Sequence, residues 1–219
     1  EANTREIPLV IGGDEAPPAS GKSATGKCLD PSRPDVVLAR FAQASESDTD
    51  RAVTCARTDP SGWEALSVDA RNEILGRVAQ EIRRARGTLM WAALANGGKT
   101  LAESDPEVSE AVDFVEFYRA TARFYFALPG LKVSPRGVVA VVPPWNFPIA
   151  IPCGGIAAAL ATGNRVILKP ASDTVLVAWE LCQCFWRAGV PRTVLQFAPC
   201  PGSGAGQSLV THADVDSVI

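Results

Sequence analysis

From residue 137 onward the chain alternates short apolar runs, rich in β-branched residues, with longer apolar runs that end at glycine. The short runs are GVVAVV at 137–142, RVILK at 165–169, VLQFAP at 194–199 and DSVI at 216–219. The longer runs between them end at Gly163 and Gly189, and SGAGQSLVTH is typical of a short helix. Strands that alternate with helices in this way predict an α/β fold, with a Rossmann-like parallel sheet and flanking helices.

The first 130 residues have a different pattern. IPLVIGG, at 7–13, is typical of a strand that enters a turn, and residues 14–35 have the composition of a surface loop or hairpin. Helical spacing then predicts helices over 48–59, 67–85, a segment ending near Asn96, and 105–127. We expect Asp105 to cap the last of these and Pro106 to be its first residue. Its aromatic residues are expected to pack in the core: Phe114, Phe117, Tyr118 and Phe124.

Charge and cysteine usage exclude several classes of protein. The net charge of −3 gives no electrostatic reason to expect a nucleic acid or an anionic membrane as a partner. The apolar stretch 147–160 is too short and too interrupted to span a bilayer, and the first ten residues lack the order of a signal peptide. The six cysteines show no metal-binding spacing, so we expect free, mostly buried thiols, no metal and a cytoplasmic location. Because the chain starts at Glu1 and ends within an expected strand, we expect a piece of a larger protein.

Three predicted strand ends carry residues that could bind a ligand. Asn146 could donate to an oxygen that becomes negative, or it could cap the following helix. Lys169 could bind ribose hydroxyls or phosphate, or be a solvated lysine. The glycine-rich PGSGAGQS at 201–208 could approach a phosphate or an adenine. SGKS, at 20–23, lacks the first glycine of a phosphate-binding loop, because that position is Ala16, so we interpret it as a surface turn.

Four segments, by their order and spacing, resemble the aldehyde dehydrogenase superfamily. They are PPWNFP at 143–148, ATGNRVILKPAS at 161–172, AGVPRTVLQFAP at 188–199 and PGSGAGQSLVTHADVD at 201–216. Within the superfamily, IPLVIGG, GGKTLAE, EAVDFVEFY and SPRGVVAVVPPWNFPIAIP look most like the Δ1-pyrroline-5-carboxylate (glutamate semialdehyde) dehydrogenases. Among those, the resemblance is greatest to the form fused to proline dehydrogenase in bacterial proline-utilisation proteins.

The resemblance implies that residues 1–219 are the NAD(P)-binding domain of such an enzyme, incomplete at the C-terminus. Residues 1–130 would be a strand, loop and helical part, and 131–219 the βαβ part that binds the cofactor. The implied cofactor is NAD, with NADP as an alternative, and the implied substrate is a small aldehyde. The resemblance also implies a homo-oligomer, a dimer in its simplest form, and fusion to or association with proline dehydrogenase.

The resemblance also assigns site residues. Asn146 would be catalytic, forming an oxyanion hole with a backbone amide and stabilising the thiohemiacetal oxygen before hydride transfer. The residues assigned to the cofactor are Pro143, Pro144, Trp145, Lys169, Ser172, Gly202 and Gly206. Lys169 and Ser172 would lie at the adenosine ribose, and the two glycines against the adenine half.

The sequence departs from the family pattern in three ways. Ser172 stands where many relatives have a glutamate, which leaves strict NAD preference open, and Asn96 stands near a position where related enzymes often carry a glutamate. The nucleophilic cysteine and general-base glutamate are expected beyond residue 219, with Cys153 and Cys200 as packing residues. Two alternatives therefore remain: a non-catalytic, structural aldehyde-dehydrogenase-like domain, or a dehydrogenase for another semialdehyde.

Overall fold

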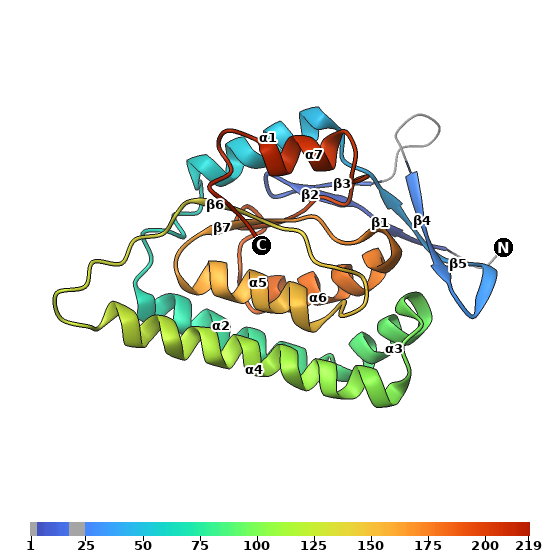
Figure 1. Ribbon diagram of the computed structural model, residues 1–219, viewed down its shortest axis with the longest axis horizontal. Helices are drawn as coiled ribbons and strands as arrows, with labels where there is room; N and C mark the ends of the chain where they lie inside the picture. The colour runs from blue at the N-terminus through green and yellow to red at the C-terminus, as the bar shows by residue number, and fades with distance from the viewer. Residues whose placement is uncertain (1–3, 18–24) are drawn as a thin grey trace.

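A six-stranded sheet, in the order β3-β2-β8-β7-β6-β9, forms the centre of the molecule (Figure 1). The structure, a computed structural model, describes residues 4–17 and 25–219, so SGKS lies outside the described residues. The strands are β2 (Leu9–Ile11), β3 (Asp14–Ala16), β6 (Val138–Val141), β7 (Arg165–Leu168), β8 (Leu195–Phe197) and β9 (Ser217–Val218). The four strands from β6 onward pair in parallel, which confirms the predicted sheet, whereas β2 joins β8 in antiparallel orientation.

Helices cover both faces of this sheet. On one face lie α1 (Glu46–Thr58) and α7 (Ala205–Thr211), and on the other lie α5 (Ala150–Ala161) and α6 (Val175–Arg187), with α2, α3 and α4 packed outside them (Figure 1). Successive residues of β6 point to opposite faces, so that Val138 and Ala140 pack in one hydrophobic cluster and Val139 and Val141 in the other. A continuous apolar run in the sequence is therefore a strand that is buried on both sides.

A smaller, three-stranded sheet extends from one end of the central sheet. Its strands are β1 (Arg5–Ile7), β4 (Thr25–Asp30) and β5 (Arg33–Ala42), in the order β1-β5-β4. The expected single strand at 7–13 is therefore two strands in two sheets, because Pro8 interrupts it and lacks the amide that would continue a ladder. The sequence analysis missed β5, in which VVLARFA follows a turn-rich segment.

The helices of the N-terminal part agree with the predicted segments, but the last of them begins earlier than predicted. They are α1, α2 (Val68–Arg84), α3 (Arg86–Gly97) and α4 (Leu101–Phe126). The N-cap of α1 is Ser45, which forms a capping box with Asp48. The N-cap of α4 is Thr100, so the expectation that Asp105 caps this helix was wrong. Pro106 lies inside α4, within its first two turns, where only one backbone hydrogen bond is lost.

The expectation that the aromatic side chains of α4 form core was wrong for two of the four. Phe117 and Phe124 are 61% exposed, and Phe114 and Tyr118 are half-buried and stacked on each other. The buried apolar residues of α4 are small: Val108, Ala111, Val112, Val115 and Ala122. These let α5 approach closely, and the Phe114 ring then covers Gly154, where an added Cβ would lie 3.2 Å from it.

The edge of the sheet at which β6, β7 and β9 begin is closed by polar side chains that find partners within the protein. Asn164 accepts from the amides of Arg136 (2.7 Å) and Gly137 (2.9 Å) and donates to the Ala159 carbonyl (3.1 Å). Arg165 donates to the Ala56 carbonyl at 2.8 Å and pairs with Glu64 at 2.6 Å. This edge therefore has a structural role.

Candidate functional site

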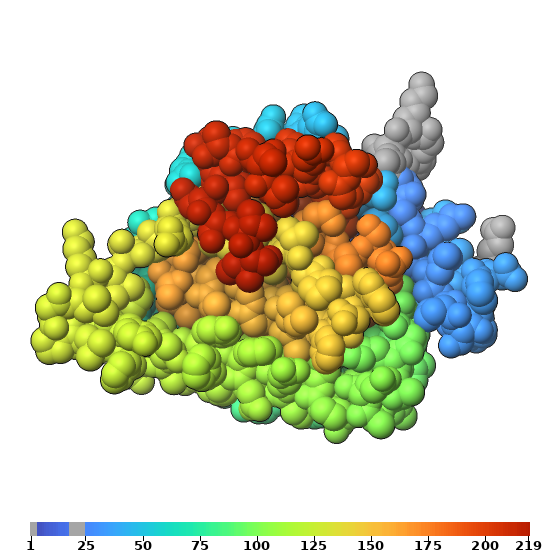
Figure 2. Space-filling view, in the orientation of Figure 1, coloured from blue at the N-terminus to red at the C-terminus, as the bar shows by residue number. Residues whose placement is uncertain are grey.

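The other edge of the sheet brings together the segments that follow β6, β7 and β8. Because these strands are neighbours and parallel, Val142–Asn146, Lys169–Ser172 and Ala198–Gly202 leave the sheet side by side. The Lys169 amide donates to the Val141 carbonyl at 2.9 Å, and the Ala198 amide donates to the Leu168 carbonyl at 2.9 Å. The end of the described chain joins the same edge, where the Val142 amide donates to the Ile219 carbonyl at 2.7 Å. In Figure 2 the red C-terminal segment lies against yellow parts of the chain.

Asn146 lies in an exposed loop and does not cap the following helix. The N-cap of α5 is Ile149, and the amides of Ile149 and Ala150 donate instead to a carboxylate oxygen of Glu107, at 2.7 and 3.1 Å. The capping interpretation of Asn146 was therefore wrong. Within residues 4–17 and 25–219 the side-chain amide of Asn146 makes no hydrogen bond, so its two N–H groups can serve a ligand.

Two residues beside the Asn146 loop, Glu107 and Lys99, were missed by the sequence analysis. The Lys99 ammonium lies 2.7 Å from the second carboxylate oxygen of Glu107, and 3.0 Å from the backbone carbonyl oxygen of Asn146. It also lies 4.4 Å from the centroid of the Phe147 ring. The sequence analysis used GGK only as part of the family resemblance, and nothing in α4 marks Glu107 as buried among the neighbouring charged residues.

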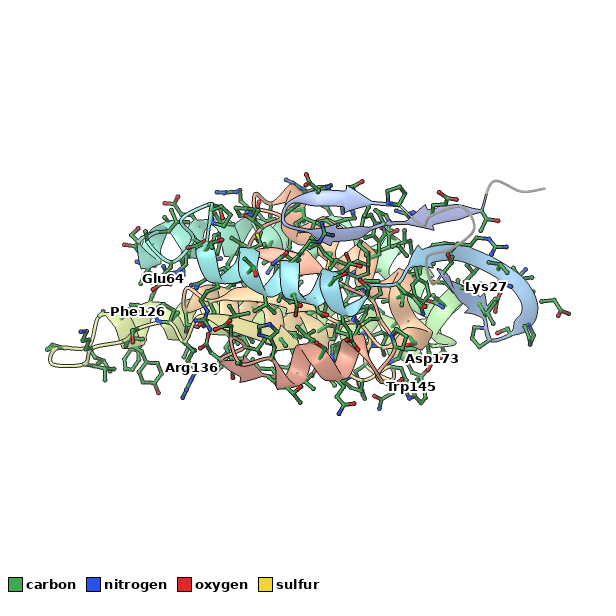
Figure 3. The ribbon with its side chains drawn as sticks, turned by 90° about the horizontal axis from the view of Figure 1, so that it is seen from above. Lys27, Glu64, Phe126, Arg136, Trp145 and Asp173 are labelled. Atoms are coloured by element: carbon green, nitrogen blue, oxygen red, sulfur yellow. The ribbon has the colours of Figure 1, made fainter. Side chains whose placement is uncertain are left out.

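Trp145 and Ser172 line one cavity of about 410 Å³ at this edge. The other residues around it include Lys27, Asn96 and Asp173, and Figure 3 shows Trp145, Asp173 and Lys27 toward the same end of the molecule. The indole of Trp145 is 57% exposed, an unusual state for so large an apolar group. An exposed ring beside a cavity with both apolar and polar lining residues is suited to contact a ligand.

Lys169 and Gly206 lie next to each other. A Cβ on Gly206 would lie 3.1 Å from the Lys169 side chain and 2.5 Å from the Pro201 carbonyl oxygen, so no larger residue fits. The Lys169 ammonium contacts the Pro170 carbonyl at 3.3 Å, a long hydrogen bond for a mostly buried lysine. The remaining predicted residues lie at the same edge, with Pro143 buried and Pro144 and Gly202 exposed.

Asn96, the second departure from the family pattern, has a structural explanation. Its amide nitrogen donates to the Leu29 carbonyl at 3.2 Å, and its oxygen accepts from the Leu176 amide at 3.2 Å. It thereby links β4 to the first turn of α6. A carboxylate could accept from Leu176 but could not donate to Leu29.

The cysteines are free, and burial keeps them protonated. Burial raises the pKa of the Cys28 thiol to about 12 and that of Cys184 to about 11. Burial also raises the pKa of Cys153 and, although Lys169 opposes it, that of Cys200. These are the properties of packing residues rather than of nucleophiles. In the described parts of the chain, no cluster of His, Cys, Asp and Glu could hold a metal ion, and no helix could cross a membrane.

Comparison with known proteins identifies the family. Residues 19–219 match the aldehyde dehydrogenase family. The chain belongs to that family. The fold agrees, since a 1-pyrroline-5-carboxylate dehydrogenase from Thermus, solved with bound NAD, superimposes with a TM-score of 0.91 at 31% identity. That superposition covers 98% of this chain and 43% of the Thermus chain.

Two further relatives point in the same direction within the family. The 1-pyrroline-5-carboxylate dehydrogenase of Geobacillus thermodenitrificans is 34% identical over 95% of this chain and 42% of its own length. Proline utilization A from Bdellovibrio bacteriovorus, inactivated by N-propargylglycine, has a TM-score of 0.89 at 30% identity, covering 97% of this chain and 23% of its own. The chain thus spans less than half the length of the family members that it matches.

Proposed function

We propose that this chain forms the NAD(P)-binding part of a dehydrogenase that oxidises glutamate semialdehyde, the open form of Δ1-pyrroline-5-carboxylate, to glutamate. The observation that carries the proposal is the group of side chains at this sheet edge. The Asn146 amide has no hydrogen-bond partner in the described residues, Trp145 is exposed, and the Lys169 ammonium makes only a long hydrogen bond. Similarity to 1-pyrroline-5-carboxylate dehydrogenases over 95% of the chain supports this substrate over other aldehydes.

The residues at this edge fit a dinucleotide. Lys169 would donate to the adenosine ribose with Ser172 beside it, and the backbone at Pro143, Pro144 and Trp145 would line the cofactor. Gly202 and Gly206 would lie against the adenine half, where Gly206 leaves no side chain in the way. NAD would supply the hydride acceptor, and NADP remains an alternative because Ser172 brings no negative charge. The role of this chain is then to bind and orient.

Asn146 would act on the reaction itself. An N–H of its side chain would donate to the aldehyde oxygen as negative charge develops there. The nucleophile and the general base would come from segments other than this one, because burial keeps the thiols of this chain protonated. We therefore propose that residues 1–130 and 131–219 serve a catalytic centre completed elsewhere in the enzyme.

Partners and location follow from the same proposal. Similarity to proline utilization A supports a fusion to, or association with, a proline dehydrogenase that delivers the substrate. The free thiols fit a reducing compartment, so we place the enzyme in the cytoplasm. The proposal of a homo-oligomer rests on the family resemblance alone.

The test uses the full-length enzyme that contains this chain, assayed with Δ1-pyrroline-5-carboxylate and NAD. Asn146→Ala should lower kcat roughly 10²–10³-fold while the Kd for NAD stays near its wild-type value. A change confined to NAD affinity would contradict the oxyanion role. Turnover by residues 1–219 alone would contradict the proposal that the nucleophile and the general base come from other segments. A full-length protein without any dehydrogenase activity would favour a structural domain.

A further inference from the structure

The loop that carries Asn146 is attached to the N-terminal helical part by an ion pair. Lys99 lies between α3 and α4, and Glu107 lies in the second turn of α4. Their side chains are 12% and 1% exposed and are 2.7 Å apart. Because water is largely excluded, the attraction within this pair is weakly screened and its geometry is well defined.

Each member of the pair also forms hydrogen bonds with the backbone of the loop or of the helix that follows it. The Lys99 ammonium donates to the Asn146 carbonyl oxygen at 3.0 Å, and Glu107 accepts from the amides of Ile149 and Ala150. The carboxylate lies at the start of α5, where the helix dipole favours negative charge, and α5 has no acidic residue of its own there. One ion pair thus determines where the loop ends and α5 begins.

The loop has few other constraints near Asn146. Residues 144–147 are exposed, and Pro144 and Pro148 have no amide to donate. The Asn146 side chain has no hydrogen bond that would orient it in the described structure. Its position is therefore set by its backbone, and the backbone is held by the ammonium of Lys99.

We infer that Lys99 and Glu107 are positioning residues for Asn146, an inference that rests on the proposed function. They fix the loop so that the side-chain amide of Asn146 faces the developing oxyanion. Neither side chain touches substrate or cofactor. The alternative is a structural role alone, in which the pair only secures the start of α5.

The experiment uses the full-length enzyme and neutralises the pair without leaving a buried charge. Lys99→Met/Glu107→Gln keeps an acceptor for the two amides and fills the space of the lysine stem, but removes the donor to the Asn146 carbonyl. We expect kcat to fall roughly tenfold or more, since a misplacement of about 1 Å can cost about 100-fold. The Kd for NAD should change less than about twofold, because neither side chain is assigned to the cofactor. A uniform loss of binding would instead raise KM and leave kcat unchanged.

The matched control is Arg5→Met/Glu180→Gln. It neutralises another ion pair with a buried carboxylate, and it should leave kcat unchanged. If Lys99→Met/Glu107→Gln does not fold, the single variant Lys99→Met, which leaves Glu107 at the start of α5, gives the same comparison. Both variants are also made in an Asn146→Ala background.

A double-mutant cycle separates the outcomes. If the pair acts through Asn146, neutralising it in the Asn146→Ala background should reduce kcat no further. The same fold-loss in both backgrounds, or no loss in either, would overturn the inference while leaving the proposed function intact. If Asn146→Ala alone leaves kcat unchanged, the proposed function itself fails.

Discussion

The two edges of the central sheet differ in how their polar side chains are used. At the edge where β6, β7 and β9 begin, Asn164 and Arg165 are buried, and their hydrogen bonds are made within the protein. At the opposite edge, Asn146 and Ser172 are exposed, and Lys169 makes only a long contact. Figure 3 shows the two edges at opposite ends, with Glu64 and Arg136 at one and Trp145 and Asp173 at the other.

We propose that this difference separates residues that stabilise the fold from residues that serve the proposed function. A buried polar group without a partner costs free energy, so the side chains of the first edge are paired within the protein and stabilise the fold. The second edge keeps donors available for a ligand, and the paired charges of Glu107 and Lys99 secure the loop beside them. Substitutions at the first edge should therefore affect unfolding, and those at the second edge catalysis, with Glu107 affecting both.

The largest effect on stability is expected for Glu107→Leu. This substitution leaves Lys99 charged and nearly buried, and leaves the Ile149 and Ala150 amides without an acceptor. The free energy of unfolding should fall by about 3–5 kcal/mol, measured by urea denaturation. Glu116→Leu on the same helix is the matched control, since its carboxylate is 39% exposed, and it should cost less than about 1 kcal/mol. Equal losses would contradict the special position of Glu107.

Asn164→Ala should have the next largest effect. It leaves the Arg136 and Gly137 amides, at the start of β6, without their acceptor. We expect a loss of about 1–3 kcal/mol in the free energy of unfolding and an unchanged kcat in the full-length enzyme. Ser172→Ala, at the other edge, should change stability by no more than about 0.5 kcal/mol. A fall in kcat for Asn164→Ala, with stability retained, would break the distinction between the edges.

Ser172→Glu should change cofactor preference rather than stability. The new carboxylate would repel a 2′-phosphate and accept from a ribose hydroxyl, and even about 1 kcal/mol of such repulsion changes a ratio about fivefold. The measurement is the ratio of kcat/KM with NAD to kcat/KM with NADP, in both proteins. An unchanged ratio would mean that residue 172 does not face the ribose.

The smallest effect is expected for Asp216→Asn, at the structural edge. Burial raises the pKa of Asp216, but hydrogen bonds from the Val138 amide and from Arg57, with the charge of Arg57, together lower it below the ordinary 3.8. A depressed carboxyl pKa stabilises the fold above the unfolded-state pKa, and this contribution is lost as the pH falls through the folded-state value. At neutral pH the variant should lose less than about 1 kcal/mol, and in acid the two proteins should converge. A difference that grows in acid would contradict this sign.

Much of this arrangement was predictable from the sequence. The β-branched runs at 137–142 and 165–169, separated by one apolar helix, left few alternatives to neighbouring parallel strands. Parallel neighbours in turn predict that Asn146, Lys169 and the glycine-rich segment lie at one edge. The resemblance added the roles of these residues, which stay predictions until the variants are measured.

Other features depended on contacts between distant segments, which local patterns do not encode. Pro8 divides one apolar run between two sheets, and α4 leaves two of its aromatic residues, Phe117 and Phe124, exposed while small residues pack against α5. A cap can be recognised from spacing when the capping residue directly precedes its helix, as Ser67 precedes α2. The cap of α5 comes from Glu107, more than forty residues away, and its partner Lys99 reaches back to Asn146. The sequence by itself determined the strands, the helices and the edge that they share. Only the tertiary structure decided which charges meet beneath that edge, because burial and pairing depend on packing and not on order along the chain.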